Sequence, residues 1–66
     1  MRHPNKMKEY RTNRGLSMKD LSLSSGISER YLYFIENGER MPSIKTAKKI
    51  ADALCGNIEL IFFGNE

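Results

Sequence analysis

The sequence has few of the residues that form disulfides, metal sites or catalytic groups in small proteins: its 66 residues include one cysteine, one histidine and no tryptophan. Because Cys55 is the only cysteine, a disulfide within the chain is excluded. A structural zinc site needs about four ligands, and His3 has no cysteine or histidine neighbour at ligand spacing. No histidine accompanies the serines and aspartates in a triad-like arrangement, and Cys55 has no partner base. We therefore expect no metal, no cofactor and no enzymatic activity.

Long apolar runs are missing as well, which excludes a membrane span, because a span needs roughly 18 such residues. The segment from Met1 to Met7 is polar and basic, so we expect no secretory signal and a cytoplasmic location. A domain of this size buries only about 60% of the surface of its unfolded chain. We expect residues 1–66 to form one domain, without room for a separate ligand domain, and oligomerisation to remain as a means of stabilisation.

Positive charge is gathered in two segments of a chain whose net charge is +3. Residues 1–19 hold six basic side chains and one acidic, and residues 40–50 hold four basic and none acidic. Between them, residues 20–39 hold four acidic side chains and one basic. Basic clusters on a small domain suggest a polyanionic partner, although ordinary solubilising charge accounts for them equally well.

Helix-ending glycines and helix-capping serines divide the chain into short segments. The glycines are Gly15, Gly26, Gly38 and Gly56, and the capping serines are Ser17, Ser28 and Ser43. Asp20 follows Ser17 by three residues, as in a capping box. The pattern predicts helices over residues 5–14, 18–25 and 28–36, and a fourth helix that begins at 43 and is closed by Gly56.

The fourth segment has a clear apolar stripe, predicted to face the core, that consists of Ile44, Ala47, Ile50, Ala51 and Leu54. Residues 57–63 fit two structures. Ile58, Ile61 and Phe62 share a helical face, whereas Ile58, Leu60 and Phe62 alternate as in a strand, and periodicity alone does not decide between them. The sequence thus predicts an all-α fold, a compact bundle of four to five short helices, with a short C-terminal strand as the alternative for the tail.

The junction between the second and third helices is the most informative part of the chain. Ser22 is small, Gly26 follows four residues later, and Ser28 caps the next helix, whose Leu32 and Ile35 face the core. A small residue lets two helices approach closely, and glycine permits a sharp bend because it adopts positive φ without strain. Two short helices joined in this way form a helix-turn-helix, whose second helix enters the major groove of DNA.

Seven short elements follow one another along the chain: Met7-x-x-Tyr10-Arg11, Gly15-Leu16-Ser17, Leu21-Ser22, Ser25-Gly26-Ile27-Ser28, Ile35-Glu36-Asn37-Gly38, Arg40-x-Pro42-Ser43 and Ile50-Ala51-x-Ala53-Leu54. Through them, residues 7–62 resemble the Xre, or lambda-repressor/Cro-like, DNA-binding domain. The resemblance implies a helix-turn-helix that binds double-stranded DNA. It also implies an ion pair between Arg11 and Glu36, since a half-buried charge is tolerable when it is paired.

The resemblance further implies base contacts from the first two residues of the recognition helix, 28–36, and from one residue a turn later. These positions hold Glu29, Arg30 and Phe34. The candidate base-reading residues are Ser28, Glu29, Arg30, Tyr33 and Phe34. Arg30 suits guanine O6 and N7, Glu29 suits cytosine N4, and Phe34 suits the thymine methyl group. The aromatic side chains suit the core or a protein interface equally well.

Phosphates bind backbone N–H groups and cations near helix starts. The candidate phosphate-binding residues are Arg14, Ser17, Met18, Lys19, Tyr31, Asn37, Arg40, Ser43 and Lys45. Met18 stands where the family usually has glutamine, which removes a side chain that bonds phosphate. Leu23 stands where a polar residue is usual.

The apolar residues Leu60, Phe62 and Phe63 predict either a symmetric dimer interface or completion of the core. A dimer would place two recognition helices about 34 Å apart, one turn of DNA. The leading interpretation is a transcription regulator, a repressor that binds an inverted-repeat operator as a homodimer. The alternative is a helix-turn-helix domain that binds a protein partner, as an antirepressor or antitoxin-like protein would, with Tyr31, Tyr33 and Phe34 as anchors.

Overall fold

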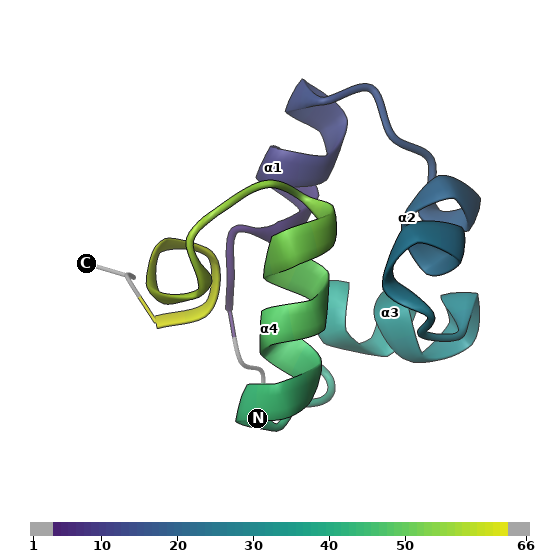
Figure 1. Cartoon of the computed structure of the whole chain (residues 1–66). Helices are drawn as coiled ribbons and strands as arrows, with labels where there is room; N and C mark the ends of the chain where they lie inside the picture. The colour runs from purple at the N-terminus through teal and green to yellow at the C-terminus, as the bar shows by residue number, and fades with distance from the viewer. Residues whose placement is uncertain (1–3, 64–66) are drawn as a thin grey trace.

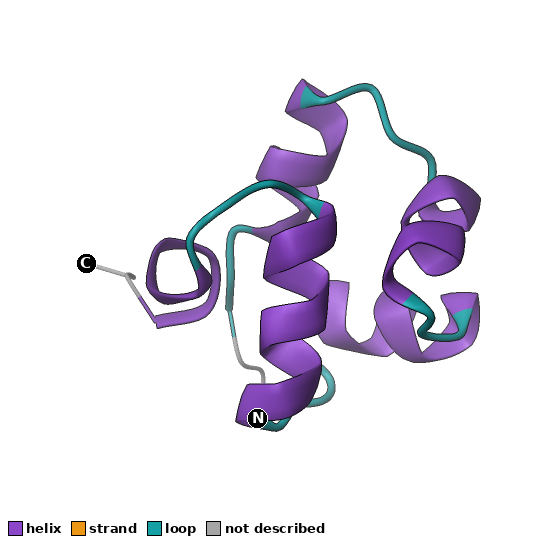
Figure 2. Ribbon diagram, viewed as in Figure 1, coloured by secondary structure: helices purple, strands orange, loops and turns teal. Residues whose placement is uncertain are grey.

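The computed structural model describes residues 4–63, and every regular element in that range is helical (Figures 1 and 2). The elements are α1 (Met7–Asn13), α2 (Met18–Ser25), α3 (Glu29–Glu36), α4 (Ile44–Ala53) and a short π-helix, η1 (Glu59–Phe63). Helix α4 runs through the middle of the domain, with α2 and α3 on one side and η1 on the other (Figure 1). The all-α prediction is confirmed, and no helix in residues 4–63 is long and apolar enough to cross a membrane.

Serine caps start three of the helices at the predicted places. Ser17, Ser28 and Ser43 each accept a hydrogen bond from the backbone N–H three residues later, at 3.0, 3.2 and 3.2 Å. At the first of these, Asp20 returns the interaction by accepting from the Ser17 N–H at 3.0 Å, which completes the capping box. Local side-chain chemistry therefore fixes where α2, α3 and α4 begin.

Helix α1 is shorter than the predicted 5–14 because its flanking residues have other partners. The Asn5 side chain accepts from the Met7 N–H at 2.9 Å and donates to the Ile35 carbonyl oxygen at 2.9 Å. The Lys6 N–H donates to the Ile61 carbonyl oxygen at 2.8 Å. The segment before α1 is thus bonded to both α3 and η1.

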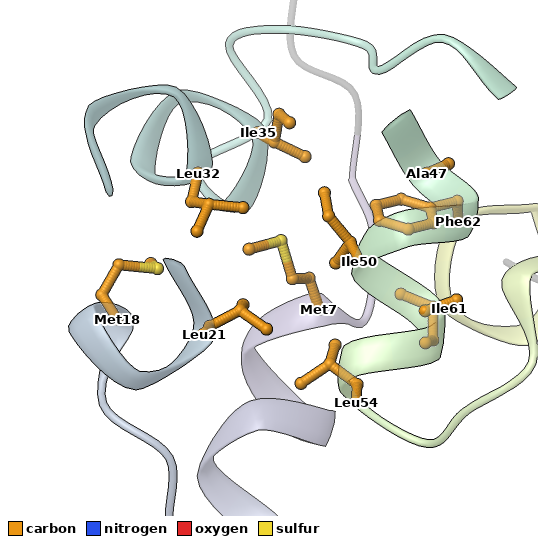
Figure 3. Close-up of a cluster of buried hydrophobic side chains, with 11 residues drawn as sticks. Met7, Met18, Leu21, Leu32, Ile35, Ala47, Ile50, Leu54, Ile61 and Phe62 are labelled. Carbon is orange, nitrogen blue, oxygen red and sulfur yellow. The ribbon is translucent and has the colours of Figure 1, made fainter. Parts of the chain in front are cut away.

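The core forms where α1, α2, α3, α4 and η1 converge (Figure 3). Met7 from α1 lies near its centre, between α2 and α4 (Figure 3). The largest fully buried side chains are Met7, Leu21, Leu32, Ile35, Ile50, Leu54 and Ile61. The predicted stripe of α4 is buried except for Ile44, which is 65% exposed. That part of the prediction is wrong because the whole first turn of α4, residues 43–45, lies at the surface.

The tail adopts the helical alternative and not the strand. Ile61 and Phe62 are both buried, at 1% and 6% exposure. Consecutive residues can face the same core on a helix but point to opposite faces of a strand. The Asn57 side chain starts the turn by accepting from the Glu59 N–H at 2.7 Å.

Helix α4 ends one residue earlier than it would if Gly56 closed it, as the sequence predicts. Cys55, and not Gly56, occupies the left-handed position, with φ of 54°. The Gly56 N–H donates to Ala51 at 2.9 Å and the Cys55 N–H donates to Asp52 at 3.1 Å, the paired bonds of a Schellman motif. Gly56 has a different role: a Cβ there would lie 2.8 Å from Ile61 Cδ1 and 3.2 Å from the Tyr10 ring, so these side chains would have to shift.

Candidate nucleic-acid interface

The turn between α2 and α3 has the geometry that the sequence predicts. Gly26 is left-handed, with φ of 76°, and its N–H donates to the Ser22 carbonyl oxygen at 2.9 Å. The Ser22 hydroxyl donates to the Ile27 carbonyl oxygen at 2.6 Å. Ser22 therefore does more than leave room for the neighbouring helix, because it bonds α2 directly to the chain that leads into α3.

A bidentate ion pair anchors the far end of α3. Arg11 Nε and Nη2 donate to the two carboxylate oxygens of Glu36, each at 3.0 Å, and Arg11 Nη1 donates to the Leu16 carbonyl oxygen at 2.8 Å. The side chains are 14% and 7% exposed. The hydrogen bonds to Glu36 raise the pKa of Arg11 above its ordinary value. Arg11 thus joins α1, the start of α2 and the end of α3 into one unit.

Helix α3 is buried along one side only. Leu32 and Ile35 are fully buried, while Ser28, Glu29 and Arg30 at its N-terminal end are exposed. Tyr33 is 49% exposed, and Phe34 and Tyr31 are half-buried. The candidate base-reading residues therefore lie on the solvent side or at its edge, where they are accessible to a groove.

Two arginines lie over the ring of Phe34, an arrangement that the sequence analysis did not identify. The distances from Cζ to the ring centroid are 5.9 Å for Arg30 and 5.8 Å for Arg40. Both lie within the range of cation–π attraction. Arg30 precedes Phe34 by four residues on a helix, a spacing that brings side chains together, so this contact had a sequence signal. The contact with Arg40 depends on the path of the α3–α4 turn and had none.

The candidate phosphate-binding residues differ in their exposure, and Tyr31 among them is half-buried. Most are exposed near the starts of α2 and α4 or in the turn after α3: Ser17, Lys19, Asn37, Arg40, Ser43 and Lys45. The first N–H groups of any helix have no intrahelical acceptor, so these starts offer donors to a phosphate. Met18 is 4% exposed with its side chain in the core, so only its backbone N–H suits that role.

Arg14 is an exposed candidate whose side chain bonds to the end of another helix. Its Nη2 lies 3.4 Å from the Cys55 carbonyl oxygen, at the end of α4. It lines a hollow of about 500 Å³ together with Lys6, Glu9, Tyr10 and Asn13. The structure groups Arg14 with α1 and α4, away from the residues around Phe34.

The acidic side chain of Asp20 lies at the start of α2, next to the candidate phosphate-binding residues Ser17 and Lys19. The hydrogen bonds from the backbone N–H and the side chain of Ser17 lower the pKa of the Asp20 carboxyl below its ordinary value. Asp20 is therefore ionised at neutral pH, where its negative charge complements the positive end of the helix.

The tail residues proposed for a dimer interface separate into buried and exposed. Phe62 packs in the core of its own chain, which agrees with core completion and not with its assignment to a dimer interface. Leu60 and Phe63 are 54% and 45% exposed. Among residues 4–63, no three histidine, cysteine, aspartate or glutamate side chains gather to hold a metal ion.

Comparison with known proteins agrees with this geometry. The HTH_3 family model, described as helix-turn-helix, matches residues 7–55. An uncharacterised HTH-type transcriptional regulator from Methanocaldococcus jannaschii is 41% identical over 58 residues, which cover 88% of each chain. The uncharacterised HTH-type transcriptional regulator YgzD from Bacillus subtilis is 34% identical over 62 residues, which cover 94% of each chain.

A solved structure has the same fold. The restriction-modification controller protein C.AhdI from Aeromonas hydrophila matches with a TM-score of 0.81 and 33% identity, over 86% of each chain. The shared helical arrangement extends beyond the matched family segment, since 86% of this chain is included.

Proposed function

The chain belongs to the HTH_3 helix-turn-helix family of non-enzymatic, DNA-binding transcription regulators, and from this premise we propose that it is a repressor that binds an inverted-repeat operator as a homodimer. One observation carries the proposal: the N-terminal end of α3 is exposed at Ser28, Glu29 and Arg30, while Leu32 and Ile35 hold the same helix in the core. The exposed, polar N-terminal end of a helix that the core holds in place can enter the major groove of DNA.

Base recognition is assigned to the exposed side of α3. Arg30 donates two hydrogen bonds to guanine O6 and N7, and Glu29 accepts from cytosine N4. Ser28 and Tyr33 are exposed beside them and bond neighbouring base or sugar atoms. Arg30 contributes most to the choice of sequence because its two donors match guanine alone.

Phosphate contacts hold this helix in register on the duplex. Lys19 and the first N–H groups of α2 lie on one side of α3 along the chain, and Arg40, Ser43 and Lys45 follow on the other. We assign phosphate contacts to both groups. They add affinity for any sequence and make binding sensitive to salt.

The size of the domain supports a dimer. Its longest extent is 27 Å, whereas successive major grooves on one face of DNA are about 34 Å apart. One copy therefore reaches one groove, and a two-fold pair reaches two. Leu60 and Phe63 of η1 are exposed apolar side chains suited to the contact between copies. Such a dimer would act in the cytoplasm by occupying the promoter.

The first test is selection of binding sites from random duplexes, followed by titration of the winners between about 50 and 200 mM salt. We expect an enriched two-fold motif and a loss of affinity of about 10³–10⁵, the range for six to ten phosphate contacts. Absence of enrichment, with binding to a protein partner that ignores salt, would replace this function by protein recognition through Tyr31, Tyr33 and Phe34.

Two variants then test the division of labour. Arg30→Ala should lose about 1–3 kcal/mol on the selected site and relax the choice of one base pair. Arg40→Ala should weaken binding to all sequences alike and reduce the salt slope by about one. Undiminished binding of the selected site by Arg30→Ala would refute the assignment of the reading side.

The dimer is tested by sedimentation at micromolar concentration, with and without the selected duplex. Leu60→Glu should yield monomer, because a charge is buried poorly in an apolar interface. Leu23→Glu is the matched control, since Leu23 is 76% exposed on α2 and has no part in the proposed contact. A parent protein that remains monomeric on a two-fold site would remove the dimer from the proposal.

A further inference from the structure

Phe34 contacts Arg40 through its backbone as well as its ring. Its carbonyl oxygen accepts from the Glu39 N–H at 2.8 Å and from the Arg40 N–H at 3.2 Å. These bonds fold the α3–α4 turn back against the helix. They bring the Arg40 guanidinium to 5.8 Å from the same ring that Arg30 approaches to 5.9 Å.

Two exposed cations beside one ring need a reason to stay there, because like charges repel and arginine side chains have much rotamer freedom. The negative face of an aromatic ring attracts a guanidinium group and offsets that repulsion. Phe34 is only half-buried, although α3 already has Leu32 and Ile35 fully in the core. Its ring is therefore not needed in full by the core and is available to the arginines.

The ring and the arginines line one surface hollow. Its volume is about 290 Å³, and its lining residues are Ser28, Arg30, Tyr31, Phe34 and Arg40. The hollow thus combines the start of the recognition helix with the turn that follows it. Arg30, assigned to a base, and Arg40, assigned to a phosphate, therefore both line it.

We propose that Phe34 is a positioning residue that holds Arg30 for a base and Arg40 for a backbone phosphate, and that it does not itself read a thymine. This inference rests on the proposed function and adds the device that links its two kinds of contact. Because the ring orders both side chains before DNA arrives, little rotamer freedom is lost on binding.

The perturbation is Phe34→Leu, which keeps an apolar side chain and removes the ring. We expect affinity for the selected site to fall about tenfold, equivalent to about 1.4 kcal/mol, with the loss of two cation–π contacts and their preorganisation. Phe34→Tyr retains the ring face and should bind within about twofold of the parent. In the Phe34→Leu background, Arg30→Ala should have a smaller effect than in the parent, because Arg30 is no longer held.

The arrangement itself is measured without DNA. Ring currents from Phe34 should displace the NMR resonances of the Arg30 and Arg40 side-chain protons, and Phe34→Leu should return both toward their ordinary values. Phe63→Leu is the control, because it removes an exposed ring from η1 and should leave both arginines unchanged. A loss of stability alone would not produce this pattern.

The two measurements separate the failures. Unchanged arginine resonances in Phe34→Leu would overturn the inference, as would parental affinity of that variant for the selected site. If the parent selects no duplex, the proposed function fails and with it the role of the ring in DNA binding, whatever the resonances show. Displaced resonances together with the tenfold loss uphold the inference.

Discussion

Removal of the Arg11 side chain is the most direct test of the ion pair that connects α1 to α3. Arg11→Ala would leave the Glu36 carboxylate, 7% exposed, without its two donors at 3.0 Å, and would leave the Leu16 carbonyl without its donor. Breaking a buried pair on one side costs about 3–5 kcal/mol. Because Arg11 is itself 14% exposed and water can partly replace it, we expect a loss of about 3 kcal/mol, at the low end of that range.

That loss is large for so small a domain. At about 0.05–0.15 kcal/mol per residue, the expected free energy of unfolding is about 3–10 kcal/mol. Each kcal/mol shifts the Tm of such a domain by about 4–8 °C, so Arg11→Ala should melt about 12–24 °C below the parent. Urea unfolding followed by circular dichroism at equilibrium measures the free energy directly.

Two controls show whether the pair is responsible. Arg14→Ala removes an arginine from the same end of α1 whose one bond is 3.4 Å long, and it should change stability by less than about 0.5 kcal/mol. The double variant Arg11→Met/Glu36→Leu should be more stable than Arg11→Ala, because no charge is left buried and unpaired. A loss below about 1 kcal/mol for Arg11→Ala, or a double variant no better than the single one, would refute the reasoning.

Three further outcomes follow from the helix ends. Cys55→Gly should stabilise the domain by up to about 1–2 kcal/mol, the cost of a left-handed residue with a side chain, measured by urea unfolding; a destabilised variant would contradict the Schellman assignment. Gly56→Ala should destabilise it, because the added Cβ would meet Ile61 Cδ1 at 2.8 Å, and an unchanged Tm would show that the tail yields easily. Asp20 should titrate by NMR below the ordinary value of about 3.9. Since the folded pKa of Asp20 is lowered, its contribution to stability is present above about pH 4 and is lost as the pH falls through that folded pKa. In Asp20→Asn, the free energy of unfolding should therefore depend less on pH in this acidic range.

The starts of α2, α3 and α4 and the end of α2 could be predicted because the signals that set them are local. Ser17, Ser28 and Ser43 act on backbone groups three residues away, and Gly26 acts on its own φ. The pair of Arg11 with Glu36 spans 25 residues, and it was expected only because the chain resembles a family in which those positions are paired.

The features that sequence reasoning missed depend on contacts between distant segments. Cys55 is left-handed, and Gly56 lies against Ile61 and Tyr10, a contact that no rule about helix ends predicts. Ile44 is exposed although it belongs to the predicted stripe, and Phe62 is buried, because the tail and not the first turn of α4 completes the core. Arg40 meets Phe34 through the course of a turn, so its spacing in the sequence carries no sign of the contact.

The bond between the Lys6 N–H and the Ile61 carbonyl oxygen has a consequence for the order of folding. It closes a loop over almost the whole described chain, whereas the contacts of α2 with α3 and α4 close shorter loops. The entropic cost of closing a loop is larger for longer loops. We therefore expect the helix-turn-helix to assemble first and η1 to dock last. Amide hydrogens of η1 should then exchange through local opening before those of α3. The element that is proposed to join two copies, η1, is thus also the last to dock in each copy.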